Sequence, residues 1–324
     1  MQSLTQTLRP SKAKVLLAYL AVYLIWGSTY LGIRIAIESI PPFLMAGFRQ
    51  LLAGIIVVVW IRAHGPVKIQ RVHWKSAFII GFLVLGMGNG GLSWAEQRVP
   101  SGIASLIIAS IPAWFVVIQS VQKTARPSVQ TIVGLVLGSI GTLILVDPAG
   151  FAGARSVDLI GASVLIVAAM GWAYGSLYSR TAEQARPAAL ATGLQMAAGG
   201  LVLCCAGALT GELREFSPAA VSTRSLVAIL YLVVFGSLIA YSSYIWLLKV
   251  SKPSNVATYA YVNPVIAVVL GWLVAGEPMD ARILLATAIT VAAVALITGG
   301  SVRRAAAEIR KPGTARALDQ QDEV

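Results

Sequence analysis

Polar and aromatic side chains recur at helical spacing within four apolar stretches of the chain. Residues three or four positions apart share one face of a helix, so each series would form a stripe along one side. The four series are Tyr23, Trp26, Tyr30 and Arg34; Asn89, Ser93 and Glu96 or Gln97; Ser237, Tyr241 and Tyr244; and Asn255, Tyr259 and Asn263. Hydroxyl, amide and ring groups of this kind can hold a small molecule by hydrogen bonds and ring contacts.

The elements that would carry these stripes are long apolar runs. Hydrophobic residues make up 57% of the 324 residues and charged residues only 12%, against about 25% charged residues in soluble domains. A helix needs roughly 20 apolar residues to cross the hydrocarbon core of a bilayer. We expect ten crossings, at Val15–Ile37, Pro42–Ile61, Trp74–Ala95, Gly102–Val121, Thr131–Val146, Leu159–Tyr178, Ala188–Leu209, Leu226–Leu248, Asn255–Ala275 and Arg282–Gly299. The sequence therefore predicts an all-α membrane protein with short connections.

The net charge of +12 follows the predicted topology. With the N-terminus in the cytoplasm, 18 of the 25 Lys and Arg residues fall on the inner side, five fall outside, and Arg34 and Arg49 lie within spans. An excess of positive charge over short inner loops sets the orientation of a membrane protein. We therefore expect both termini in the cytoplasm and lipid around the helices. No basic stripe interleaved with aromatics indicates a nucleic-acid partner.

Two features recur in the same order in the two halves of the chain. Trp26 is followed eight residues later by Arg34, and Trp172 is followed eight residues later by Arg180. A Pro-Ser pair also precedes a further proline in each half: Pro100 and Ser101 before Pro112, and Pro253 and Ser254 before Pro264. Each half holds five predicted spans, an odd number, so the second half must enter the membrane from the opposite side. Inverted repeats of this kind are typical of secondary transporters, which bind substrate between the halves.

The repeat predicts four segments. Residues 1–14 would form a cytoplasmic N-terminal segment, residues 15–147 and 148–300 the two inverted five-helix repeats around a central cavity, and residues 301–324 a cytoplasmic C-terminal tail.

The stripes have two interpretations. Polar groups in hydrocarbon need partners, and interhelical hydrogen bonds worth only ~0.6 kcal/mol each on average would satisfy any single stripe. Stripes in equivalent and flanking helices of both halves favour a shared wet cavity instead. The expected substrate-binding residues are Trp26, Tyr30, Asn89, Ser93, Trp172, Tyr241, Tyr244, Tyr259 and Asn263.

Two prolines and a group of charges inside or next to the spans complete the candidates. Pro112 and Pro264 each remove a backbone donor and interrupt a helix, so they would act either as hinges or as static bends. Ionisable groups within spans are costly and need a partner or a task. Arg34 and Arg49 lie near Glu38 and Glu96 on this threading, where the four would form an outer salt-bridge network. The alternative is a role in substrate release or proton coupling, with Glu96 as the relay.

Enzyme chemistry finds little support in the sequence. The two histidines, His64 and His73, fall in one basic loop. No zinc-binding H-E-x-x-H motif, P-loop or G-x-S-x-G elbow is present, so we expect neither a metal nor any other cofactor.

Several short motifs resemble one known family. They are Trp26-Gly27-Ser28-Thr29 in the first span, Pro41-Pro42 followed by Arg49 in the second, and Tyr261-Val262-Asn263-Pro264-Val265 before Gly276-Glu277. Together with two five-span halves, they resemble the drug/metabolite transporter superfamily and its EamA-type exporters, near the YedA-like members. The resemblance runs from about residue 15 to residue 300. It implies a basket of helices around a cavity lined by spans 1, 3, 4, 6, 8 and 9, with spans 5 and 10 at the periphery.

The residues and the resemblance together predict a secondary transporter. It would export small amino-acid-like or amphipathic metabolites across the bacterial inner membrane by alternating access, with a proton or a counter-substrate as the coupling partner. The sequence sets no oligomeric state. Two alternatives are a transporter of anionic phosphate-bearing metabolites, which would want several mid-depth cations, and a membrane sensor that binds a ligand without moving it.

Overall fold

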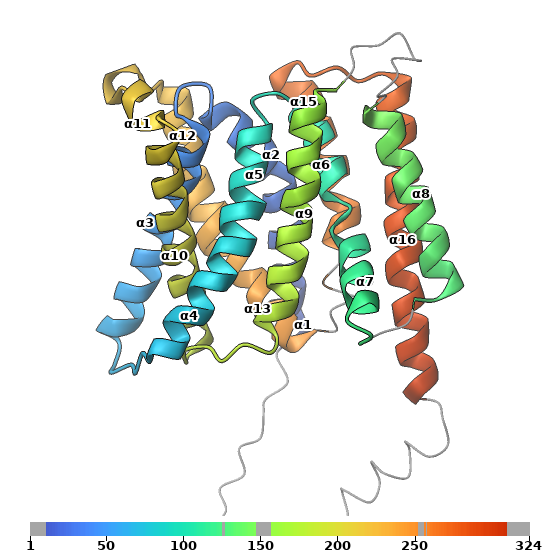
Figure 1. Cartoon of the computed structure of the whole chain (residues 1–324), viewed down its shortest axis with the longest axis horizontal. Helices are drawn as coiled ribbons and strands as arrows, with labels where there is room; N and C mark the ends of the chain where they lie inside the picture. Colours follow the sequence, from blue (N-terminus) through green and yellow to red (C-terminus); the bar gives the residue numbers. More distant parts are fainter. Residues whose placement is uncertain (1–10, 125–126, 147–156, 252–255, 257, 310–324) are drawn as a thin grey trace, which may run out of the picture.

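The protein is a bundle of helices that run roughly along one common direction (Figure 1). A computed structural model describes residues 11–124, 127–146, 157–251, 256 and 258–309. The elements are α1 (Lys12–Leu20), η1 (Ala21–Ile25), α2 (Trp26–Ala36), α3 (Pro42–Ala63), α4 (Arg71–Ile80), η2 (Gly81–Gly90), α5 (Gly91–Ala95), α6 (Ser101–Ile108), α7 (Ile111–Val121), α8 (Val129–Val146), α9 (Leu159–Ser179), α10 (Ala188–Leu209), α11 (Glu212–Glu215), η3 (Pro218–Ala220), α12 (Thr223–Tyr231), η4 (Leu232–Tyr241), α13 (Ser242–Val250), α15 (Tyr259–Ala275) and α16 (Ala281–Ile309). No strand occurs in these residues, and the predicted all-α class is confirmed.

Seven helical stretches in the described residues are long and apolar enough to cross a membrane. They are α1 to α2, α3, α4 to α5, α6 to α7, α9, α10, and α12 to α13. Three shorter apolar helices, within α8, α15 and α16, occupy the positions of the predicted fifth, ninth and tenth spans. The predicted count of ten crossings therefore stays a prediction. Asn255, at the start of the ninth predicted span, lies outside the described residues.

The two halves pack on each other through matching pairs of helices. α3 packs along α10, and α8 packs along α16. α2 contacts α12, η4 and α15, while its counterpart α9 contacts η2, α5, α6 and α7. In Figure 1, α3 ends at the bottom beside α4, whereas α10 ends at the top beside α11. Equivalent helices thus run in opposite directions, as an inverted repeat requires.

Close approach between α3 and α10 depends on glycine. A Cβ atom on Gly54 would lie 2.4 Å from the backbone nitrogen of Ala197, and one on Gly200 would lie 2.4 Å from the backbone nitrogen of Leu51. Real Cβ contacts are never this short, so the two backbones pack directly on each other at these points. Small residues at helix contacts in membranes permit this packing.

Carboxylates from the second half cap two helices of the first half. Glu212 accepts hydrogen bonds from the backbone nitrogens of Phe43 (3.1 Å) and Leu44 (2.8 Å) at the start of α3. Glu277 accepts from Ser101 (2.7 Å) and Gly102 (3.0 Å) at the start of α6. The first turn of a helix leaves its N–H groups unpaired and favours negative charge. These contacts therefore link the halves at one end of the bundle.

Three crossings contain π-helical turns: η1, η2 and η4. The two longer ones, η2 and η4, fall in the equivalent third and eighth predicted spans, and each has 10 residues. A π-helical turn is rare and often marks a functional site, because it redirects side chains within an otherwise regular helix.

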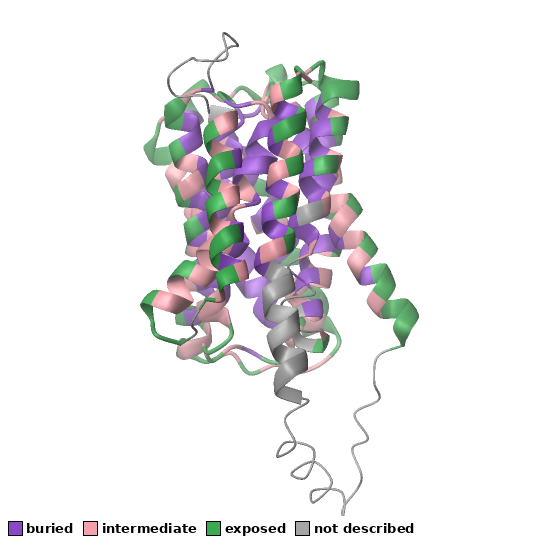
Figure 2. Cartoon of the chain, turned by 90° about the vertical axis from the view of Figure 1, so that its right-hand side faces the viewer, coloured by how far each residue is buried: buried purple, intermediate pink, exposed green. Residues whose placement is uncertain are grey.

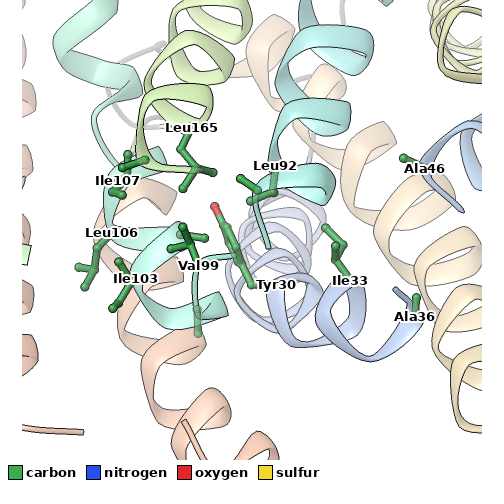
Figure 3. Packing of buried hydrophobic residues seen from close by; sticks show 14 of the residues in the cluster. Tyr30, Ile33, Ala36, Ala46, Leu92, Val99, Ile103, Leu106, Ile107 and Leu165 are labelled. Carbon is green, nitrogen blue, oxygen red and sulfur yellow. The ribbon is translucent and has the colours of Figure 1, made fainter. Parts of the chain in front are cut away.

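Burial separates the interior of the bundle from its outer surface. Figure 2 shows buried residues gathered inside and exposed residues on the outside. Many exposed residues are large and apolar, among them Phe48, Trp60 and Trp272, which is the pattern expected of a lipid-facing surface. The largest core cluster joins α2, α6 and α9 and holds Tyr30 among Leu92, Val99 and Leu165 (Figure 3).

Candidate substrate-binding cavity

A cavity of about 70 Å³ lies between the two halves, near the middle of the bundle. Its wall is formed by Trp26, Thr29, Tyr30, Ile33, Arg49, Gln50, Leu85, Gly88, Asn89, Leu92, Ile108, Ile111, Ala168, Trp172, Gly236, Ser237, Tyr241, Tyr259 and Asn263. Ligand pockets usually measure about 300–1,000 Å³, so this space is small for a metabolite and the helices pack closely around it.

Spans 1, 3, 4, 6, 8 and 9 all contribute to this wall, as the family resemblance implies. α3 contributes as well, through Arg49 and Gln50. α8 and α16 pack on each other at one side of the bundle (Figure 1) and supply no wall residue.

An aromatic cluster forms one side of the cavity. The Trp26 ring lies 5.8 Å from the Trp172 ring at 85° and 5.4 Å from the Tyr259 ring at 81°, both edge-to-face contacts. Tyr244 packs against Trp26 at 4.9 Å. The Trp26 indole nitrogen also donates to the Gly236 carbonyl oxygen at 3.3 Å. Edge-to-face contacts stabilise ring pairs beyond their buried area, so Trp26 of the first half is held by partners from the second half.

Seven of the nine predicted binding residues line the cavity: Trp26, Tyr30, Asn89, Trp172, Tyr241, Tyr259 and Asn263. Ser93 and Tyr244 do not. Ser93 is fully buried, and its hydroxyl has no hydrogen-bond partner among the described residues. Tyr244 packs behind Trp26 and Trp172 and supports their rings.

Asn263 serves a structural contact as well as the cavity wall. Its amide nitrogen donates to the carbonyl oxygens of Tyr23 (3.1 Å) and Tyr259 (3.2 Å) when the amide is oriented to satisfy both. Asn263 therefore ties the first crossing to α15, and its donor capacity is used within the protein.

The charged residues differ from the predicted salt-bridge network. Glu38 pairs with Arg224, with 3.6 Å between Nη1 and Oε1. Arg34 donates to the backbone carbonyl oxygen of Glu96 at 2.6 Å, and Arg49 donates to the side-chain oxygen of Asn89. No ion pair within the described residues joins either arginine to Glu38 or Glu96. The predicted network is therefore not formed among the described residues, where each of the two arginines donates instead to a neutral oxygen.

Glu96 lies one residue past the end of the crossing helix Arg71–Ala95. Its side chain is fully buried, and neither carboxyl oxygen has a hydrogen-bond partner in the described part of the chain. Burial raises the pKa of this carboxyl well above its ordinary value; Glu277 adds to the rise, and Arg34 and Arg49 oppose it. Glu96 can therefore exchange a proton at a pH where an exposed glutamate stays ionised.

The two predicted hinge prolines lie in different surroundings. Pro112 is in the first turn of α7, directly after a break that separates α7 from α6. Pro264 lies inside α15, which continues past it without interruption. The expected interruption is therefore present at Pro112 and absent at Pro264.

Polar side chains join the cavity to a vestibule at the end of the bundle that carries the α3–α4 loop. The vestibule has a volume of about 760 Å³ and is lined by residues that include Lys68, Arg180 and Arg186. Tyr241 donates from its hydroxyl to Gln195 Oε1 at 3.3 Å, and Gln195 donates from Nε2 to Gln184 Oε1 at 2.9 Å. Tyr241 lies on the cavity wall, whereas Gln195 and Gln184 line the vestibule.

Charged side chains contact one another and an aromatic ring at the opposite end of the bundle. Two ion pairs lie there: Glu38 with Arg224 (3.6 Å) and Arg98 with Asp158 (3.6 Å). Arg98 also stacks over the Trp94 ring, 5.0 Å from its centroid. These contacts link neighbouring elements at this end, while the hydrogen bonds of Tyr241, Gln195 and Gln184 lie between the cavity and the vestibule.

A bundle of crossing helices around a polar and aromatic cavity defines a multi-pass membrane protein with a candidate binding site between its two halves. The model of the EamA-like transporter family matches residues 13–147 and 159–299. The chain therefore belongs to this family of membrane transporters, within the drug/metabolite transporter superfamily, as its motifs predict. The two matches, one in each half, agree with the repeat.

Several curated proteins are similar over most of the chain. The protein described as an uncharacterized inner membrane transporter, YedA, from Escherichia coli (strain K12) is 35% identical, with 87% of this chain and 90% of YedA covered. The uncharacterized transporter YvbV of Bacillus subtilis (strain 168) is 26% identical, with 92% of this chain and 95% of YvbV covered. A solved crystal structure shares the fold, with a TM-score of 0.61 at 19% identity over 90% of this chain and 99% of that chain.

Proposed function

We propose that the protein is a secondary transporter that exports small amino-acid-like or amphipathic metabolites by alternating access. The observation that carries the proposal is a cavity between two oppositely directed halves, next to a vestibule at the end of the bundle that carries the α3–α4 loop. A transporter must expose one binding site to each side in turn, and inverted repeats supply two related conformations for this purpose.

The vestibule would face the cytoplasm. It lies on the side of the Lys68 and Arg71 loop and of Arg180 and Arg186, which the positive-inside rule assigns to the cytoplasm. Both termini would then be cytoplasmic in an inner-membrane protein, and the repeats would span residues 15–147 and 148–300. Substrate would enter from the vestibule once the layer formed by Tyr241, Gln195 and Gln184 opens.

We assign roles to particular residues of the cavity wall. Trp26, Trp172 and Tyr259 would surround the apolar part of the substrate, and their faces would also accept a cation. Asn89 and Ser237 would orient polar groups. The break before Pro112 would allow α6 and α7 to change their mutual angle. Phosphate-bearing substrates are less suited to this wall, because Arg49 is its one charged residue within the described residues.

Counterflow in proteoliposomes tests the proposal. The probe is the metabolite whose excretion differs most between cells with and without the protein. Trp26→Ala removes the ring that contacts three other aromatics, so we expect counterflow to fall at least tenfold. Trp60→Ala is the matched control, because Trp60 is 60% exposed on the outer surface. Wild-type counterflow by Trp26→Ala, or no metabolite moved by the unmodified protein, would contradict the proposal.

A further inference from the structure

We propose that Arg49 anchors a carboxylate of the transported molecule, so that the cavity selects monoanionic or zwitterionic carboxylic acids. The inference rests on the proposed transport function and names the substrate class of the same cavity. Arg49 is a cation on the cavity wall, and part of its hydrogen-bonding capacity is not satisfied by the described residues.

Arg49 is a buried guanidinium with an incomplete set of partners. The residue is 2% exposed and lines the cavity. One Nη atom donates to the neutral side-chain oxygen of Asn89. The Nε atom is buried with no partner, and no ion pair among the described residues includes Arg49. A buried charge with an unpaired donor and no ion-pair partner is costly, so the arrangement favours an anion that arrives from outside the protein.

The nearest acid does not fill this role. Glu96 is close enough to act electrostatically on Arg49, yet its carboxyl oxygens form no hydrogen bond to any described residue. The groups that act on the Glu96 charge are Glu277, Arg34 and Arg49, and Glu96 in turn acts on the Tyr30 phenol. Arg34, the other cation, is held by the Glu96 backbone. Arg49 is therefore the cation of this cluster that keeps an unpaired donor, and it lies on the cavity wall.

The geometry of a guanidinium matches a carboxylate. Its donors lie in one plane and pair with the two oxygens of a carboxylate, whereas an amide oxygen such as that of Asn89 uses only one or two of them. Asn89 would then hold one edge of the Arg49 group and leave another for the ligand. A single guanidinium balances one negative charge, which distinguishes a carboxylate from a phosphate monoester.

Other residues of the cavity wall indicate further features of the substrate. Gln50 adjoins Arg49 in α3, and its buried Oε1 atom has no partner among the described residues. An unpaired acceptor beside a cation suits an ammonium or hydroxyl group next to the carboxylate. The rings of Trp26 and Trp172 suit an apolar or aromatic body. The wall thus fits a small carboxylic acid with an apolar body, with or without an amino group.

Benzoate and benzamide test the inference directly. They have nearly the same shape and differ in charge, and binding to the purified protein in nanodiscs can be followed by tryptophan fluorescence and by the thermal unfolding midpoint. We expect benzoate to bind at least tenfold more tightly than benzamide near neutral pH, because only benzoate pairs with the guanidinium. Equal binding of the two probes by the unmodified protein would overturn the inference without any variant.

Three substitutions extend the test. Arg49→Gln is expected to abolish the preference for benzoate, and Arg49→Lys to retain a weaker preference. Arg224→Gln, which removes a cation from an outer ion pair, is expected to keep the full preference. A preference that survives in Arg49→Gln would overturn the inference. Counterflow separates the two proposals. If the protein exports a neutral metabolite and binds both probes equally, only the carboxylate anchor is contradicted. If it prefers benzoate but shows no counterflow, the anchor is supported and transport is contradicted.

Discussion

At the residue scale, the carboxyl group of Glu96 has the clearest electrostatic consequence. Burial without a hydrogen bond raises its pKa above the ordinary value of 4.5 in the folded state. The folded protein then binds this proton more tightly than the unfolded chain. The stabilisation from the bound proton is fully present below the unfolded-state pKa and is lost as the pH rises through the folded-state pKa.

We therefore expect the unmodified protein to lose thermal stability relative to Glu96→Gln as the pH rises above the ordinary glutamate pKa of 4.5. Glutamine keeps the shape of the protonated acid and cannot ionise. The measurement is the unfolding midpoint in detergent across this range for both proteins. Glu215→Gln changes an exposed carboxylate and should follow the unmodified protein. Parallel curves for Glu96→Gln and the unmodified protein would contradict the expectation.

Helical periodicity predicted most, but not all, of the residues that line the cavity. Spacing placed seven of nine expected side chains on one cavity, because a stripe of polar and aromatic groups must turn away from lipid. It did not identify Gln50 and Thr29, which lie outside the stripes. The adjacent polar pair Arg49 and Gln50 in an otherwise apolar helix was the signal for Gln50. The partners of Asn263 and Glu38 depend on other helices, and sequence spacing carries no information on such contacts.

At the element scale, the α3–α10 contact depends on backbone proximity. A Cβ atom at Gly54 would be within 3 Å of backbone atoms of Gly193 and Ala197, and backbone atoms cannot swing aside as a flexible side chain can. We expect Gly54→Ala to separate the helices and to destabilise the protein by about 1–3 kcal/mol.

The measurement for Gly54→Ala is the thermal midpoint of the purified protein. Gly138→Ala in α8 is the matched control, because the nearest contact of its Cβ would be the Ala293 Cβ atom at an ordinary 3.5 Å. A similar midpoint for the two variants would show that α3 and α10 can move apart at little cost.

The positions of the helices could be predicted from the apolar runs of the sequence, but the internal geometry of the helices could not. The apolar runs located the helices, because a segment in hydrocarbon must pair its own backbone groups. The same runs could not reveal the π-helical turns in η2 and η4, because hydropathy does not distinguish an α-helical turn from a π-helical turn. Proline also acted differently at its two positions: α6 ends before Pro112, while α15 continues through Pro264.

At the scale of the whole molecule, the two ends of the bundle differ. One end holds the basic vestibule, and the other holds two ion pairs. If the basic end faces the cytoplasm, as the distribution of Lys and Arg predicts, an impermeant thiol reagent will distinguish the two. Cys204 and Cys205 are free thiols, so both would first be replaced by alanine.

We expect Gln184→Cys, in the vestibule, to react in inverted membrane vesicles and to be protected in intact cells whose outer membrane has been made permeable. Ser217→Cys, beside α11 at the opposite end, should show the reverse pattern. Two positions on opposite sides of the membrane are separated by an odd number of crossings, and of the membrane-length helices only α10 lies between Gln184 and Ser217. Reaction of both cysteines from one side would mean that α10 does not cross the membrane. Reaction of each from the side opposite to the expected one would place the vestibule outside the cell, and the direction of entry assigned to the substrate would then be reversed.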